Sequence, residues 1–529
     1  MSRTRRLRRE QKQTAKPEPR ATIKGDSAPE TPVPRAPLWL AAAFLLPNLG
    51  ALACGFVFDD RVLLVENQSM HIRSLGQLLH IWKSGYWPDN RGLELYRPVA
   101  QTVWALAWAA GGGAHPAVFH AIGLALGLAV VLLLYRLLLA VRTPPRTAFL
   151  AACLFALFPI HTDATTSVAG SAELMAAAFA LGALLLYYRN RPIPALLLFA
   201  LAVFSKESAA AFAALPLVFP PYDLPSRHSP TDTGESGGWR RRLPNRFAAI
   251  GAAAVIAAAL LAHHAVSRSS QIPAIDNPAA LLGADRRILT ALWVQCLYVC
   301  KTVLPVVLSA DYSYKQIPLV MGLADWRAWA GLALAGGALF LAWRRREWRA
   351  PVLAYAILFS PTANILFPIG TIMGERLAYA PSLGLALALA IPLARWREWK
   401  NVLLAVALVF AARTAVRNLD WIDAGRFYIK LVETSPESAK SHYSIGVLRS
   451  ANGDDAGAIE CYDRAIAIFP AYAEAYRNRG NALARLGRRE EAMASYRQCL
   501  RFAPGDFAAT TNLRELEAGL PVNPPRARL

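Results

Sequence analysis

The chain has 529 residues, of which 55% are apolar and only 18% are charged, and its formal net charge is +21. So few charges over this length argue against a single water-soluble enzyme, and the strongly apolar segments exclude a disordered or collagen-like chain. The class of protein that these observations predict is therefore a polytopic membrane protein. The lysines and arginines gather in short runs between apolar stretches, as expected of cytoplasmic loops, so the positive charge requires no nucleic-acid partner.

The first 36 residues are basic and proline-rich without an apolar run, which predicts a disordered cytoplasmic tail. Residues 37–57 are long and apolar enough to cross about 30 Å of hydrocarbon as a helix that starts on the inside. We predict about eleven spans in a membrane domain that covers 37–417. The spans after the first are expected at 115–141, 146–159, 171–189, 192–204, 208–220, 246–265, 325–343, 350–367, 377–395 and 400–416.

Two further apolar stretches, 96–110 and 288–308, do not fit this count. A crossing by one of them alone would put the basic loops that follow on the wrong side of the membrane. Both stretches are rich in aromatic residues, which favours helices that lie at the outer interface. Two ordinary spans are the alternative, because a crossing by both would invert only the region between them.

From residue 418 the sequence becomes charged, alanine-rich and periodic, with a repeat of 34 residues. This pattern is typical of tetratricopeptide repeats, in which small residues let two helices cross closely, tyrosine fills the gap and proline ends the second helix. We assign 418–520 to this α-solenoid, which is short enough to need support from the membrane domain or a partner, and 521–529 to a disordered tail. The repeating positions are Gly446, Ala458, Tyr462 and Pro470, then Gly480, Ala492, Tyr496 and Pro504.

Three loops on the expected outer side carry polar groups. The first follows the opening span and contains the adjacent carboxylates Asp59 and Asp60. A carboxylate at a low-dielectric boundary loses solvation, tends to have a raised pKa and suits a general base. The alternative is a pair of solvated loop acids beside Arg61.

The second loop brings His161, Asp163 and Glu173 to the same face. A histidine beside proline at a helix end is more often a hydrogen-bonded structural residue than a base or a ligand. With the aspartate pair, His161 and Asp163 could bind Mg²⁺ or Mn²⁺, but so few ligands do not indicate a metal site, and no cofactor is expected. The six cysteines lack zinc-finger spacing and imply no disulfide framework.

The third loop places Glu375 and Arg376 at the entrance to a span, where function is the first hypothesis for a charged residue. Arg376 could hold a phosphate that Glu375 helps to orient, and a snorkelling arginine paired with its neighbour is the alternative. Lys206 and Glu207 also interrupt an apolar run on the outer side, and Lys206 could be a second phosphate contact. An acid pair with nearby cations suits a reaction in which a hydroxyl is deprotonated and a lipid-linked phosphate leaves.

The chain carries the motifs FVFDD, VEN, YRPV, HPAVFH, FPIHTDA, SKES, LSADYSYKQIP and FPIGTIMGERLAYAPSLG in this order. In these motifs, and over nearly its whole length, it resembles the transmembrane and tetratricopeptide repeat-containing O-mannosyltransferases, which are GT-C glycosyltransferases. The resemblance implies an all-α protein in which a polytopic membrane domain of GT-C type precedes the repeats. It also implies transfer of a sugar from a polyprenyl-phosphate donor to a protein hydroxyl on the outer or luminal side.

The resemblance further implies roles for the acidic residues of the first two loops. Asp59 and Asp60 match the acidic pair of the first external loop, one of which would be the catalytic base. Asp163 and Glu173 match acidic positions of the second loop. The family tends to have an arginine just before the acidic position of that loop, where this chain has Ser171.

In the third loop, Glu375, Arg376 and Tyr379 match an ERxxY element, for which we infer binding of the donor phosphate. Because Ser171 stands in place of the family's arginine, Lys206 or Arg376 would have to supply the missing contact. The substrate-binding residues expected from the loops and the resemblance together are His161, Asp163, Glu173, Lys206, Glu207, Glu375, Arg376 and Tyr379.

We therefore expect an inverting transfer of mannose or a similar hexose to a serine or threonine hydroxyl, with an aspartate base and a leaving phosphate that needs no acid catalyst. The repeats are expected to present the acceptor protein. Arginine- and alanine-rich usage suggests a bacterial inner membrane, with the N-terminus cytoplasmic and the repeats extracytoplasmic. The main alternative is a non-enzymatic, membrane-anchored repeat scaffold for envelope assembly. A transporter would instead place charges near mid-bilayer and show inverted repeats, which the sequence does not.

Overall fold

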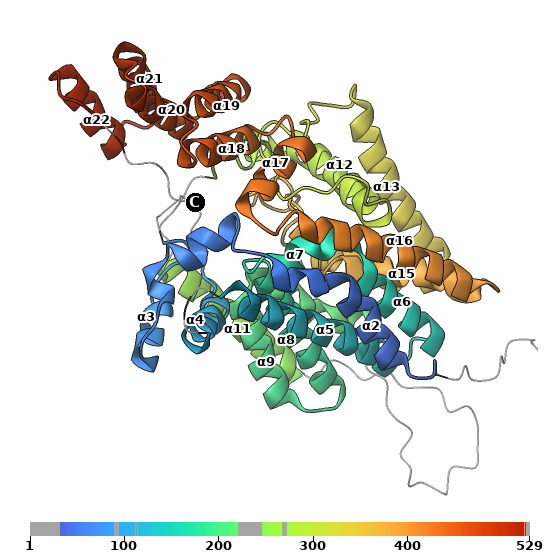
Figure 1. Cartoon of the computed structure of the whole chain (residues 1–529). Coiled ribbons are helices and arrows are strands. Elements are labelled where there is room, and N and C mark those ends of the chain that lie inside the picture. The colour runs from blue at the N-terminus through green and yellow to red at the C-terminus, as the bar shows by residue number, and fades with distance from the viewer. Residues whose placement is uncertain are drawn as a thin grey trace, which may run out of the picture.

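The computed structural model describes residues 32–88, 95–111, 113, 115–220, 246–266, 272–522 and 524. Within these ranges the regular secondary structure is helical and contains no strand, which confirms the all-α expectation. Most of both expected tails, residues 1–31 and 525–529, lies outside the described residues. Figure 1 shows a large helical body and, at one end of it, a row of short helices that forms the C-terminal part of the chain.

A helix covers at least part of every predicted span, but the predicted span 350–367 is helical only as far as Phe359, and residues 360–367 form no helix. The first is α2 (Ala36–Asn48), which η1 (Leu49–Ala53) continues. The others are α5 (Pro116–Ala140), α6 (Pro145–Leu157), α8 (Ser171–Tyr188), α9 (Pro192–Ser205), η6 (Glu207–Ala214) with α10 (Leu215–Val218), α11 (Arg246–Val266), α13 (Trp326–Arg344), α14 (Arg346–Phe359), α15 (Ser382–Arg395) and α16 (Trp399–Leu419).

Shorter elements connect these helices at one end of the body. They are η2 (Arg61–Val65), η3 (Gln68–Met70), η4 (Leu75–Gln77), α3 (Leu78–Ile81), η5 (Pro159–His161), α7 (Thr162–Thr166), η7 (Pro278–Leu281) and η8 (Glu375–Ala378). The two apolar stretches outside the span count are the helices α4 (Pro98–Ala110) and α12 (Ala284–Val303). Whether they lie at the interface or cross the membrane stays a prediction.

Only some of these helices meet the length and hydropathy expected of a complete crossing. Among the described residues there are five such helices, or up to six if the pair Pro145–Leu157 and Pro159–Thr166, bent by 52°, is one span. Helices α9 and α15 are apolar but have 14 residues each, and 14 residues rise only about 21 Å. The chain is therefore a membrane protein with several apolar helices, and the count of eleven spans stays a prediction.

The helices alternate in direction, so that one end of the body collects basic loops. Helices α5, α8, α13 and α15 all end next to arginines. The opposite ends of the helices lead into the three predicted polar loops. The basic residues at the first end are Arg142, Arg146, Arg189, Arg191, Arg344, Arg345, Arg346, Arg395, Arg397 and Lys400.

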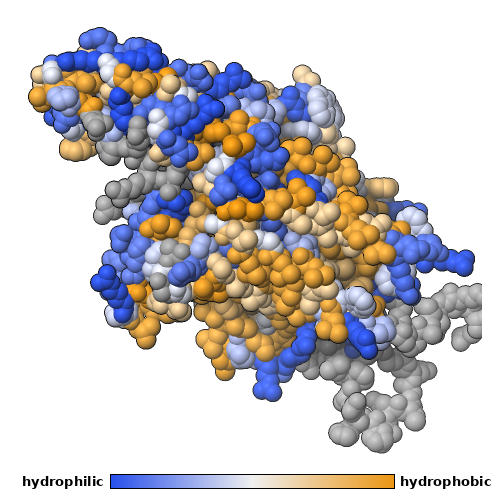
Figure 2. All heavy atoms as spheres, viewed as in Figure 1, coloured by the Kyte–Doolittle hydropathy of each residue, from blue (hydrophilic) through white to orange (hydrophobic). Residues whose placement is uncertain are grey.

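The core of the body lies around α6. Every residue of this helix from Thr147 to Leu157 is buried, and α2, α5, α15 and α16 pack around it. The outer faces of α13 and α16 are apolar and exposed, including Leu339, Phe340, Leu404 and Leu408. Figure 2 shows hydrophobic surface over the helical body and a more hydrophilic surface over the repeats.

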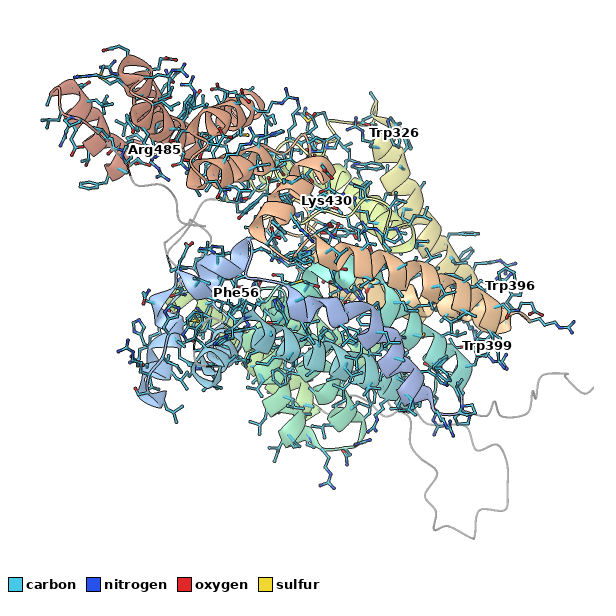
Figure 3. The ribbon with its side chains drawn as sticks, viewed as in Figure 1. Phe56, Trp326, Trp396, Trp399, Lys430 and Arg485 are labelled. Atoms are coloured by element: carbon cyan, nitrogen blue, oxygen red, sulfur yellow. The ribbon has the colours of Figure 1, made fainter. Side chains whose placement is uncertain are left out.

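Tryptophan marks both ends of this apolar surface. Trp326 begins α13 at one end, and Trp396 and Trp399 lie at the opposite end, where α15 finishes and α16 begins (Figure 3). Trp326 and Trp396 are exposed. Tryptophans are enriched at the two membrane–water interfaces, so their placement fits a bilayer whose interfaces lie at these two ends.

The repeats form the helices α17 (Ala424–Thr434), α18 (Ala439–Ala451), α19 (Asp455–Ile468), α20 (Ala473–Arg485), α21 (Arg489–Phe502) and α22 (Phe507–Glu517). The repeated small residues do permit a close crossing. A Cβ atom added at Gly446 would lie 2.7 Å from the ring of Tyr462, and one added at Gly480 would lie 2.7 Å from the ring of Tyr496. This confirms the expectation drawn from the 34-residue spacing.

We expect Gly446→Ala to destabilise the repeats by about 1–3 kcal/mol, because its methyl group would overpack the contact with Tyr462. Gly480→Ala should destabilise the repeats to a similar extent, because its methyl group would overpack the contact with Tyr496. Gly505→Ala is the matched control, since nothing lies within 4 Å of a Cβ built there. Thermal unfolding of the purified full chain measures the effect, and equal midpoints for Gly446→Ala and Gly505→Ala would contradict the packing.

Candidate active site

Asp59 and Arg376 form an ion pair at the end of the body opposite to the basic loops. They stand 317 positions apart in the chain, and Asp59 Oδ2 accepts hydrogen bonds from Arg376 Nη1 at 2.9 Å and Nη2 at 3.0 Å. The Asp59 side chain is 18% exposed and that of Arg376 is 33% exposed, so both can be reached from outside the protein. The nearby Asp59 carboxylate raises the pKa of Arg376 against the opposing effect of burial, which keeps the guanidinium charged.

The turn that carries Asp59 is fixed by its neighbours on both sides. Phe58 has a positive φ of 54°, which turns the chain between the first helix and η2. Its ring packs against Phe427 of α17, with 5.5 Å between the ring centroids. The position of Asp59 therefore depends partly on the repeat domain.

Asp60 lies in different surroundings from its neighbour. Its side chain is 1% exposed, and it accepts hydrogen bonds from Ser167 Oγ at 3.1 Å, Val168 N at 3.0 Å and Ala169 N at 2.7 Å. Burial raises the pKa of Asp60 to about 7, and these hydrogen bonds oppose the shift only in part. Asp60 thus holds the turn between α7 and α8, and of the two aspartates Asp59 has the more accessible carboxylate.

The second loop reaches the same place through Asp163. This residue is 4% exposed, and its Oδ2 accepts a hydrogen bond from the backbone N–H of Arg376 at 3.1 Å. All three predicted loops therefore meet here, because Arg376 of the third loop contacts Asp59 of the first through its guanidinium and Asp163 of the second through its backbone. The third acidic position, Glu173, does not join this pair.

Glu173 and Lys206 form a separate buried ion pair, and their neighbour Glu207 pairs with Arg97. Arg97 donates to Glu207 from Nε at 3.0 Å and from Nη2 at 2.6 Å, and its guanidinium lies 4.9 Å from the ring centroid of Tyr86. Electrostatic interactions link Lys206 to Asp163 and Arg376. The four charges form a second layer beside Asp59 and Arg376.

Glu375 points away from Asp59 into the protein. It is fully buried and accepts hydrogen bonds from Ser309 N at 2.7 Å and Tyr312 Oη at 2.5 Å, while Arg417 lies 3.9 Å away. Burial raises the pKa of Glu375 to about 7, although Arg417 and the hydrogen bonds act in the opposite direction. These contacts make Glu375 an anchor for the segment that carries Arg376.

His161 and Tyr379 pack together beneath the site. His161 Nε2 lies 2.8 Å from Ser382 Oγ, and its ring centroid is 4.6 Å from those of Tyr379 and Phe155. Both side chains are buried. Their contacts are those of structural residues, which favours the alternative given for His161 from the sequence, while a role in substrate binding stays a prediction for both.

Ser171, which stands where the family tends to have an arginine, accepts a hydrogen bond from Trp104 Nε1 at 3.0 Å. Among the described residues, no three or more histidine, cysteine, aspartate or glutamate side chains lie close enough to one another to hold a metal ion. All six cysteines are free.

Sequence reasoning assigned no role to Arg97, Arg417, Ser309 or Tyr312. Arg97 is the arginine of the motif YRPV, and Ser309 and Tyr312 belong to the motif LSADYSYKQIP. Both motifs carry the resemblance, but neither predicts a role for these side chains. Arg417 directly follows the predicted span 400–416, and a charged residue at the end of an apolar helix is expected to have a partner.

The repeats dock on the loop that holds Glu375. Ser435 Oγ of the α17–α18 turn hydrogen-bonds Ser309 Oγ at 2.7 Å and the Asp311 backbone oxygen at 2.6 Å. Ser438 Oγ donates to the Asp311 carboxylate. Lys440 Nζ pairs with Asp276 at 2.5 Å. This polar contact, which we call the repeat junction, supports the short solenoid on the membrane domain, as its length predicted.

Comparison with known proteins gives matches in both parts of the chain. A model described as "Protein O-mannosyl-transferase TMTC, DUF1736" matches residues 267–339, and models described as "TPR repeat" and "Tetratricopeptide repeat" match 449–487 and 473–506. The protein O-mannosyl-transferase TMTC3 of Mus musculus is 25% identical over 490 residues, which cover 84% of this chain and 52% of that protein. The chain is thus similar to TMTC proteins over most of its length.

A second TMTC relative, the protein O-mannosyl-transferase F38B6.6 of Caenorhabditis elegans, is 27% identical over 82% of this chain and 63% of its own length. The chain thus spans between about half and just under two thirds of these two relatives. An oligosaccharyltransferase of Archaeoglobus fulgidus covers 81% of this chain and 58% of its own, at 16% identity and a TM-score of 0.36. The segment that matches the TMTC model, 267–339, contains Asp276, Ser309 and Asp311 of the repeat junction, and also Tyr312, which donates to Glu375.

Proposed function

We propose that this chain is a membrane glycosyltransferase of GT-C type that moves a hexose, such as mannose, from a polyprenyl-phosphate donor to a serine or threonine of a protein. The relatives named as protein O-mannosyl-transferases support the class of reaction. The observation that carries the proposal is the ion pair of Asp59 and Arg376, which joins a carboxylate and a phosphate-binding group at one exposed place.

The position of this pair supports an extracytoplasmic site. It lies at the end of the helical body away from the arginine-rich loops, and such loops are retained on the cytoplasmic side. The N-terminus would then be cytoplasmic and the repeats extracytoplasmic. A bacterial inner membrane is part of the proposal.

The geometry suggests how donor binding activates the base. Without donor, the Arg376 guanidinium is occupied by Asp59. A phosphate binds arginine through two parallel hydrogen bonds and competes for the same nitrogens. Donor binding therefore releases the Asp59 carboxylate, which becomes free to accept the proton of the acceptor hydroxyl.

In the transfer step, the acceptor oxygen attacks the anomeric carbon while the bond from that carbon to the phosphate oxygen breaks. The hydroxyl proton passes to Asp59, and the polyprenyl phosphate leaves as an anion held by Arg376. A single displacement inverts the anomeric configuration. The carboxylates of Asp59 and Asp163 also stabilise positive charge that develops on the sugar ring.

The remaining charged residues would line the donor site. Lys206 would be a second phosphate contact, with Glu173 and Glu207 holding Lys206 and Arg97 in place. Asp163 fixes the backbone of Arg376 and thereby the direction of its side chain. The repeats would present the acceptor, because stacked helical repeats offer a concave surface for peptides.

The test is sugar transfer by the purified full chain from a panel of radiolabelled polyprenyl-phosphate sugars, with release of free sugar measured in parallel. We expect one hexose donor to be consumed and its sugar to be transferred with inversion. A folded protein that neither transfers nor hydrolyses any donor of the panel would favour a non-enzymatic scaffold.

A further inference from the structure

The ion pair of Arg97 and Glu207 repeats the arrangement of Arg376 and Asp59 at the same end of the helical body. In each pair, two guanidinium nitrogens donate to one carboxylate, at 3.0 Å and 2.6 Å for Arg97 and at 2.9 Å and 3.0 Å for Arg376. The Arg97 side chain is 12% exposed and that of Glu207 is 54% exposed. An arginine held in this way is charged and oriented, and another anion can take the place of its carboxylate.

The neighbouring pair of Glu173 and Lys206 has different surroundings, although α4, which follows Arg97, packs against α9, which Lys206 ends (Figure 1). Its side chains are only 7% and 5% exposed, so separating them would leave an uncompensated charge inside the protein. Glu207 instead regains water when it leaves Arg97, and an ion pair with an exposed partner is easier to separate. Of these two cations, Arg97 therefore exchanges its partner for an incoming anion more readily.

Tyr86 connects Arg97 with the proposed catalytic pair. The Arg97 guanidinium lies 4.9 Å from the ring centroid of this buried tyrosine, and electrostatic interactions join Tyr86 to Asp59 and to Arg376 as well. The two arginines are also close enough to repel each other. Two positive charges held near each other raise the local concentration of anions, so the pair of arginines favours a single anion that contacts both.

We propose that Arg97 is a further contact for the donor phosphate, and that Glu207 occupies its guanidinium until the donor binds. This inference rests on the proposed function, because it concerns the same phosphate. When the bond from the anomeric carbon to the phosphate oxygen breaks, its electron pair stays on that oxygen and the phosphate gains a negative charge. A second guanidinium near Arg376 therefore stabilises the leaving phosphate more than the bound donor.

The test is binding of undecaprenyl phosphate, and of the uncharged undecaprenol, to the purified full chain in detergent, which requires no sugar transfer. The wild type is expected to bind the phosphate about 10-fold or more tightly than the alcohol. Arg97→Gln should weaken binding of the phosphate by about 10-fold or more, the scale of a hydrogen bond to a charged group. Arg73→Gln, which changes an exposed arginine of the segment before α4, is the matched control and should bind both lipids as the wild type does.

Two further variants distinguish a phosphate contact from a structural ion pair. Glu207→Gln removes the carboxylate that competes for Arg97, so it should tighten binding of undecaprenyl phosphate, whereas a structural pair would suffer alike from the loss of either partner. Arg97→Lys keeps the charge but loses the planar fork, so its affinity for the phosphate should lie between those of the wild type and Arg97→Gln.

The outcomes separate this inference from the proposed function. Equal losses of phosphate binding in Arg97→Gln and Glu207→Gln would make the pair structural and overturn the inference. Wild-type binding of the phosphate in Arg97→Gln would also overturn it and would leave the proposed function standing. A wild type that binds the phosphate no better than the alcohol would overturn the proposed donor, and this inference with it.

Discussion

Replacing Asp59 by asparagine is expected to lower sugar transfer by about 100-fold or more, the usual scale for a positioned base. The amide is nearly the same size as the carboxylate but cannot take the hydroxyl proton. It can still accept one hydrogen bond from Arg376, whose guanidinium contacts a single Asp59 oxygen. The variant should therefore fold, and initial rates with the donor identified in the panel measure the loss.

Two neighbouring acids serve as controls for this result. Glu66→Gln changes an exposed acid of the same loop and should leave the rate unchanged. Asp60→Asn should act through stability instead, because Asp60 accepts hydrogen bonds from two backbone N–H groups and a serine, and an unsatisfied buried group costs about 1–3 kcal/mol. Wild-type turnover in Asp59→Asn, or loss of turnover in a stable Asp60→Asn, would reverse the roles given to the two residues.

The meeting of Asp59 with Arg376 was predictable because helix direction alternates along the chain. Basic loops mark one side, so each polar loop between them must lie on the other side. The same argument predicts that Asp163 and Lys206 lie at the end of the body opposite to the basic loops, and the structure places them there. The Gly446–Tyr462 contact followed likewise from a fixed repeat offset.

The different roles of Asp59 and Asp60 could not be read from the sequence. The two residues are adjacent and chemically identical, and the positive φ of Phe58 and the backbone N–H groups of 168 and 169 decide which one is buried. Glu375 was likewise grouped with Arg376, although the two side chains point in opposite directions. Its partners, Ser309 and Tyr312, come from a loop more than sixty positions away in the chain.

The repeat junction gives the repeats a part in the candidate site, in addition to the acceptor binding proposed for them. Trp421 and Phe427 are buried with Cys54 and Val57, just before the turn that carries Asp59. Ser435 binds Ser309, which in turn donates its backbone N–H to Glu375, the residue next to Arg376. Contacts from α17 and the turn that follows it therefore support both halves of the Asp59–Arg376 pair.

A chain cut after Asn418 is accordingly expected to lose donor hydrolysis as well as protein transfer. Burial of each large apolar side chain contributes about 1.5–3 kcal/mol, so removing Trp421 and Phe427 takes a large part of the ordinary stability of a protein, about 5–15 kcal/mol. A chain cut after Pro470 keeps these residues and the whole repeat junction. It should hydrolyse donor at the wild-type rate and lose protein transfer by about 10-fold for each 1.4 kcal/mol of acceptor binding removed.

The double variant Ser435→Ala/Ser438→Ala tests the same connection in the full chain. It removes the hydrogen bonds from Ser435 to Ser309 and from Ser438 to Asp311. It also removes the N-cap of α18, where Ser438 Oγ accepts from the backbone N–H of Ser441, so thermal unfolding of the variant is measured alongside. Donor hydrolysis should fall together with protein transfer, because the change acts through Glu375 and Arg376. If only protein transfer falls, or if the chain cut after Asn418 still hydrolyses donor at the full rate, then the repeats bind the acceptor without supporting the site.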